Sequence, residues 1–61
     1  MNRLQYFRER ANLTQAELSQ KTGVDQGLIS RVEKGIKDLT GQRWRVIAEA
    51  LDCSVDELLR V

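Results

Sequence analysis

The segment from Gln26 to Lys34 carries side chains whose types and spacing suit the binding of a nucleic acid. The amide of Gln26 can bond to N6 and N7 of adenine, and the guanidinium of Arg31 can bond to O6 and N7 of guanine or to a phosphate. Ser30 can contact a base or a phosphate, and Lys34 can contact a phosphate. A helix would place these residues on one outer face. The alternative interpretation is an ordinary solvated helix face.

Gly27 is an unusual residue for the first turn of a helix, because glycine there costs about 0.8–1.0 kcal/mol relative to alanine. We expect that its missing side chain lets the helix backbone approach a groove closely; the alternative is tolerance at an exposed site. Asp25 is interpreted as the N-cap, although its carboxylate could instead accept from N4 of cytosine. Leu28 could touch a thymine methyl group or cover the edge of the core.

Further candidate phosphate contacts lie outside this segment. Gln15 opens a predicted helix, and helix N-termini attract anions. Lys34 and Lys37 flank Gly35, where the chain leaves the predicted third helix, and would position a nucleic acid without reading its sequence. Arg43 could join them from the next helix. Solvated side chains are again the alternative.

Five helix starts are visible in the sequence. The predicted N-caps are Asn2, Thr14, Asp25, Thr40 and Ser54. A glutamate follows both Thr14 and Ser54 by three residues, which makes two capping boxes, and Gln5 gives Asn2 a weaker one. The predicted helices are 2–11, 15–22, 26–34, 41–51 and 55–60.

Left-handed residues are predicted to end these helices at Asn12, Gly23 and Gly35, with Asp52 a less favourable fourth. Apolar residues recur with the helical period, and no alternating strand pattern competes. Trp44 is predicted to lie in the core, and Cys53 to be a small, largely apolar residue. The sequence therefore predicts one all-α domain over residues 1–61.

Composition limits what this domain can do. In 61 residues there are one cysteine and no histidine, which excludes an internal disulfide and the usual metal clusters, so neither a metal nor a cofactor is predicted. A free thiol fits the cytoplasm, and no apolar run is long enough to cross a membrane. Charge is distributed unevenly along the chain. Residues 1–46 carry nine basic and five acidic side chains, a net charge of +4. Residues 47–61 carry one basic and four acidic side chains, a net charge of −3. A basic face and an acidic end follow.

Gly23-Val24-Asp25 alone separates the second and third predicted helices. A link this short and led by glycine forces a sharp bend, which is the helix-turn-helix arrangement. The side chains that can form its shared core are Leu18, Val24, Ile29 and Val32. The third helix is then free to enter a DNA major groove with its N-terminal turn on the base edges.

The chain resembles the helix-turn-helix domain of phage lambda-type repressors and Cro. The resemblance rests on LTQAELSQKTGV, ISRVEKG and IAEALDCSVDELL, and on the order and spacing of the five helices. It implies a five-helix bundle that binds double-stranded operator DNA, commonly as a dimer. It also implies that Gln26 reads a base, that Gln15 holds a phosphate and braces the reading helix, and that Arg8 pairs with Glu33.

We therefore predict a sequence-specific transcriptional regulator, a repressor, that acts on a palindromic operator. A homodimer could form through Val55, Leu59 and Val61, whose apolar surface could exceed what one small core needs. Catalysis is not expected, since no recognisable catalytic arrangement is present and so small a domain could hardly enclose a pocket. The alternative is a protein-interaction module on the same fold, such as an antitoxin or adaptor, which would not need Gln26 and Arg31.

Overall fold

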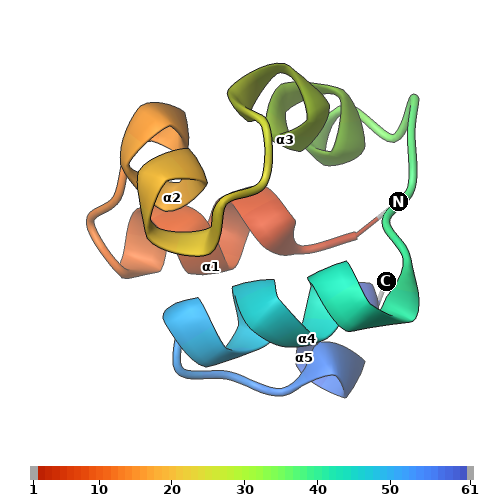
Figure 1. Ribbon diagram of the computed structural model, residues 1–61. Helices are drawn as coiled ribbons and strands as arrows, with labels where there is room; N and C mark the ends of the chain where they lie inside the picture. The colour runs from red at the N-terminus through yellow and green to blue at the C-terminus, as the bar shows by residue number, and fades with distance from the viewer. Residues whose placement is uncertain (1, 61) are drawn as a thin grey trace.

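The computed structural model describes residues 2–60, and within them α-helix is the only regular secondary structure, joined by turns and short irregular links. The helices are α1 (Leu4–Arg10), α2 (Gln15–Thr22), α3 (Gln26–Glu33), α4 (Gly41–Ala50) and α5 (Val55–Leu59). In Figure 1, α2 and α3 lie above α1, and α4 and α5 lie below it. α2 packs against both α3 and α4, and α1 packs against α3 and α5. The predicted five-helix bundle is confirmed.

Local side-chain caps explain where four of these helices begin. Thr14 Oγ1 accepts from the Glu17 N–H at 3.0 Å, and the Glu17 carboxylate accepts from the Thr14 N–H at 2.8 Å. Ser54 and Glu57 form the second predicted capping box. The side chains of Asp25 and Thr40 cap α3 and α4 through single bonds. Each cap supplies acceptors to backbone amides that the first helical turn leaves without partners.

The first predicted helix start is wrong by two residues. α1 begins at Leu4, with Arg3 as its N-cap and no side-chain capping bond from Arg3. Asn2 still contributes, because its Oδ1 accepts from the Leu4 N–H at 3.0 Å, while its Nδ2 donates across the bundle to the Val32 carbonyl at 2.9 Å. Gln5 bonds to Glu9 and does not complete a box. A tertiary bond to α3 thus holds Asn2 outside the helix.

Left-handed residues follow four of the helices, as predicted. Asn12, Gly23, Gly35 and Asp52 have φ values of 59°, 78°, 78° and 56°. The ends of α1, α3 and α4 have the paired backbone bonds of a Schellman motif: at α3, Ile36 N–H donates to the Arg31 carbonyl and Gly35 N–H to the Val32 carbonyl. Four helices end one residue before the predicted limit, namely α1, α3, α4 and α5.

The inward faces of all five helices meet in one apolar core. It consists of Leu4, Phe7, Leu18, Val24, Ile29, Val32, Leu39, Trp44, Ile47, Ala48, Leu51 and Leu58. The predicted helix-turn-helix core and the buried position of Trp44 are therefore confirmed. Cys53 is half-buried against this core, and burial raises the pKa of its thiol. No helix among residues 2–60 is long and apolar enough to span a membrane.

Candidate nucleic-acid interface

The turn between α2 and α3 fixes the face that α3 presents to solvent. Gly23 takes the left-handed conformation at the end of α2, and Val24 is buried beneath the turn. On α3, Ile29 and Val32 are fully buried, so the opposite face of the helix must point outward. Because these two side chains are buried and the link before α3 is short, α3 has little freedom to rotate about its axis.

The outward face of α3 carries the residues predicted to contact DNA. Gln26, Gly27 and Arg31 are exposed, and Ser30 is half-buried. Lys34 is exposed directly after the helix. Leu28 is half-buried and packs against the core, which favours its interpretation as cover for the core edge.

The first turn of α3 brings two charged side chains to the bare backbone of Gly27. A Cβ atom at Gly27 would lie 3.0 Å from Oδ2 of Asp25 and 3.6 Å from Nη2 of Arg31. The same Oδ2 accepts from the Leu28 N–H at 3.1 Å, which is the capping bond of α3. A side chain at residue 27 would therefore crowd the capping carboxylate of Asp25, whereas the Arg31 guanidinium would stay at ordinary van der Waals distance.

Glu33 joins three helices behind the outward face of α3. Its Oε2 accepts from Nε of Arg8 at 2.6 Å, and its Oε1 accepts from Nη2 of Arg8 at 3.2 Å and from Nε2 of Gln15 at 2.9 Å. Arg8 also donates from Nη1 to the Leu13 carbonyl. The hydrogen bond and the charge of Glu33 raise the pKa of Arg8, so the guanidinium stays charged. The structure thus brings Gln15, at the start of α2, into contact with the last residue of α3.

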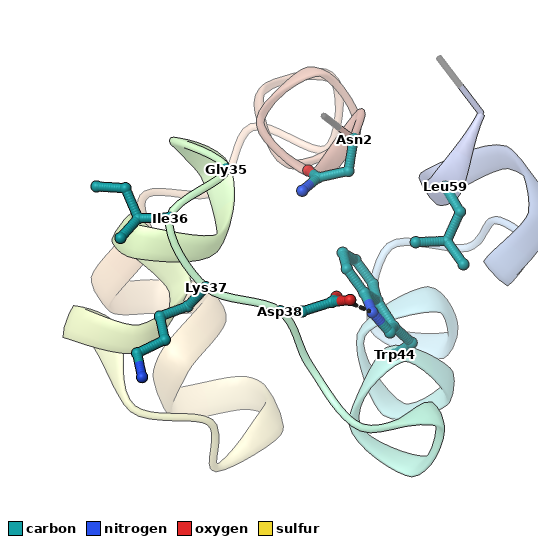
Figure 2. Close-up of a pocket in the computed structure, with 7 residues that line it drawn as sticks. All are labelled: Asn2, Gly35, Ile36, Lys37, Asp38, Trp44 and Leu59. Atoms are coloured by element: carbon teal, nitrogen blue, oxygen red, sulfur yellow. Dashed lines mark hydrogen bonds between the residues drawn. The ribbon is translucent and has the colours of Figure 1, made fainter.

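The loop after α3 holds two predicted phosphate contacts and is itself anchored. Lys34 and Lys37 are both exposed. Oδ1 of Asp38 accepts from Nε1 of Trp44 at 3.0 Å and from the Leu39 N–H at 2.8 Å, which ties the end of the loop to α4. Figure 2 shows this bond at the edge of a groove of about 290 Å³ that the loop forms with Asn2, Trp44 and Leu59.

Several features of this region were not predicted from the sequence. Asp38 was not singled out, although an aspartate just before a predicted helix start, with a tryptophan in the first turn, was a visible signal. Ile36 lies between the two lysines and is 67% exposed, which is uncommon for so apolar a side chain. The bond between Asn2 and Val32 has no local signal, because it joins residues 30 positions apart.

Arg43 occupies a different place from the other predicted contacts. It is exposed on α4 and lines a groove of about 440 Å³ with Gly23 and Val24 of the turn and with Val46.

The three residues predicted to form a dimer interface differ in how far they are buried. Val55 is half-buried against the core, Leu59 is 45% exposed, and Val61 lies outside the described residues.

Two helices cross at a three-residue turn, and the second presents a polar face to solvent. This arrangement is typical of helix-turn-helix DNA-binding proteins. A family model described as helix-turn-helix matches residues 4–58. The chain belongs to this family, of the lambda-repressor-like type, and is a DNA-binding regulator. A search of curated proteins found no match to it.

Proposed function

We propose that this regulator reads a specific operator sequence, and that it acts as a repressor by occupying that site. α3 enters the major groove and presents its N-terminal turn to the base edges, where Gln26 and Arg31 form the sequence-dependent contacts. Ser30 contributes from the same face. An adaptor or antitoxin role on this fold is the competing proposal.

One observation carries the proposal: Gln26 and Arg31 are exposed on the helix whose other side is fixed by fully buried Ile29 and Val32. A rigid helix that presents an amide and a guanidinium can hold both in a defined register against base edges. An adaptor surface would have no need of side chains with this hydrogen-bonding geometry.

Phosphate contacts would flank the reading helix and fix its position. Gln15 is well placed, because it lies at the N-terminus of α2 and its amide is oriented by Glu33. Lys34 and Lys37 supply charge from the loop, and Arg43 supplies it from α4. These contacts add affinity without sequence preference.

Two copies of the protein would place two α3 helices about 34 Å apart on a palindromic site. The exposed part of Leu59 at the end of α5 supports a contact there, together with Val55 and Val61. Leu59→Glu should weaken both self-association and DNA binding while the domain stays folded. Sedimentation that shows the same association for the variant and the original protein would contradict this interface.

Selection of bound duplexes from a random DNA pool tests the reading of sequence. We expect a palindromic consensus that relaxes at one position in Arg31→Ala. Arg10→Ala is the matched control, because Arg10 lies over the Phe7 ring and beside Leu51 and Asp52 at the turn between α4 and α5. If no consensus emerges, and binding falls with salt alone, only phosphate attraction remains and the adaptor proposal leads.

A further inference from the structure

Asn2 joins the start of α1 to the end of α3 through both polar atoms of its amide. Oδ1 accepts from the Leu4 N–H at 3.0 Å, and Nδ2 donates to the Val32 carbonyl at 2.9 Å. The neighbouring Arg3 N–H donates to the Leu58 carbonyl at 2.8 Å, in the last turn of α5. Because this backbone bond holds residue 3 in place, the Asn2 amide is kept against α3.

The Val32 carbonyl lies where α3 passes into the loop that follows it. This carbonyl accepts from the Gly35 N–H at 3.0 Å as well as from Asn2. A carbonyl oxygen has two lone pairs, so it can accept the tertiary bond and the bond that closes the helix end together. Asn2 therefore holds the turn that directs the chain from α3 into the loop.

The loop after α3 is anchored at its two ends and not by its own large apolar side chain. Ile36, near the middle of the loop, is 67% exposed and so does not hold it against the core. At the far end, Oδ1 of Asp38 accepts from Nε1 of Trp44 at 3.0 Å. Asn2, Asp38 and Trp44 line the same groove beside the loop (Figure 2). A side-chain bond at each end thus fixes the loop.

We propose that Asn2 is a positioning residue for DNA binding, which acts by holding the loop that carries Lys34 and Lys37. The inference rests on the proposed function, in which both lysines contact phosphates, and deepens it. A binding surface loses less conformational freedom on association when the backbone that carries it is already fixed. Asn2 need not contact DNA itself, since it acts through the Val32 carbonyl.

Asn2→Ser separates this tie from the start of α1. A serine hydroxyl can still accept from the Leu4 N–H, because serine forms turns with the backbone N–H two residues on. It is too short to replace the amide that donates to Val32. The bond from the Arg3 N–H is made by the backbone and stays in place.

Hydrogen exchange of single amides shows whether the tie holds the loop. In Asn2→Ser, the Gly35 and Ile36 N–H groups should exchange about 2- to 12-fold faster, the factor that one hydrogen bond is worth. The Cys53 N–H, which donates to the Ala48 carbonyl in the equivalent bond at the end of α4, is the internal control and should not change. Unchanged exchange at Gly35 and Ile36 would overturn the proposal.

Binding to duplex DNA shows whether the tie serves function. Measured well below the Tm, Asn2→Ser should bind selected and random duplexes about 2- to 12-fold more weakly, because the tie cannot contribute more than one hydrogen bond is worth. Ala48→Gly is the control for stability, since it weakens α4, which packs against α2 and α5. It should lower the Tm and leave the affinity for DNA unchanged.

A double-mutant cycle tests the route of the effect. In a protein that already carries Lys34→Ala and Lys37→Ala, Asn2→Ser should cause no further loss of affinity, because the side chains that Asn2 positions are gone. A purely structural role would give the same loss with and without the lysines, and that result would overturn the proposal.

The outcomes also distinguish this inference from the proposed function. If the lysine variant binds DNA weakly but Asn2→Ser binds as tightly as the original protein, the positioning role is wrong while the phosphate contacts stand. If the lysine variant binds as tightly as the original protein, the loop does not contact phosphates, and the positioning role fails with that part of the proposed function.

Discussion

The guanidinium of Arg8 and the carboxylate of Glu33 form a two-point ion pair that joins α1 to the last residue of α3. Nε of Arg8 lies 2.6 Å from Oε2, and Nη2 lies 3.2 Å from Oε1. The side chains are only 11% and 4% exposed. A pair this well shielded differs from a surface salt bridge, because neither charge can return to water when the other is removed.

Glu33→Ala should therefore lower the free energy of unfolding by about 3–5 kcal/mol, which is the cost of leaving a buried charge without its partner. Urea titration followed by circular dichroism measures it. Arg8→Met combined with Glu33→Leu is the matched control, because it removes both charges and should retain much of the stability. A loss below about 1 kcal/mol in Glu33→Ala would place the pair among ordinary surface contacts.

Trp44→Phe should loosen the loop that follows α3. The change keeps an aromatic ring in the core but removes the N–H that donates to Asp38 at 3.0 Å. We expect a stability loss of about 0.5–1.5 kcal/mol. Because Lys34 and Lys37 lie on this loop, affinity should fall by the same factor for specific and random duplexes. Titrations with both duplexes check this, and a loss confined to the specific site would argue against a phosphate-contacting loop.

Asp52→Gly should stabilise the protein. Asp52 has φ of 56°, and the left-handed conformation costs an L-residue about 1–2 kcal/mol, more than the roughly 0.5–1 kcal/mol that glycine loses in entropy. Its charge also lies at the C-terminal end of α4, whose last turn holds no basic residue. A gain of about 1 kcal/mol would raise the Tm by roughly 4–8 °C. Asp52→Asn removes the charge and keeps a side chain that tolerates the left-handed conformation, so an equal gain there would exclude backbone strain as the cause.

Acid should weaken the start of α5. Hydrogen bonds from the backbone N–H and then the hydroxyl of Ser54 lower the pKa of Glu57 below its ordinary value of 4.5. A carboxyl with a depressed pKa in the folded state stabilises the fold above its unfolded pKa, and this contribution disappears as the pH falls through the folded pKa.

Unfolding midpoints measured from about pH 6 to pH 3 should therefore decline more steeply in the original protein than in Glu57→Gln. Glutamine preserves the capping box but does not titrate. Parallel profiles for the two proteins would show that Glu57 has no part in the acid response.

Much of the architecture could be read from neighbouring residues. The capping boxes of Thr14 and Ser54, the turn at Gly23 and the left-handed Asn12 and Asp52 were all predicted, because a cap or a helix end depends on residues within about five positions of one another. The buried face of α3 followed from its apolar spacing. The exposed places of Gln26 and Arg31 followed in turn, since a helix with one side in the core must present the other.

Contacts between distant residues were decided by the tertiary structure alone. The bonds from Asn2 to Val32 and from Gln15 to Glu33 join residues 30 and 18 positions apart, and no local pattern marks them. The pairing of Arg8 with Glu33, and a bracing role for Gln15 toward the third helix, were anticipated only through the family resemblance. At Gly27 the sequence suggests close approach to a groove, and the fold adds that a Cβ there would lie 3.0 Å from Oδ2 of the capping Asp25. The start of a helix depends on a few neighbouring residues. The direction of a long polar side chain depends instead on which charged or polar group of a distant segment the fold places beside it.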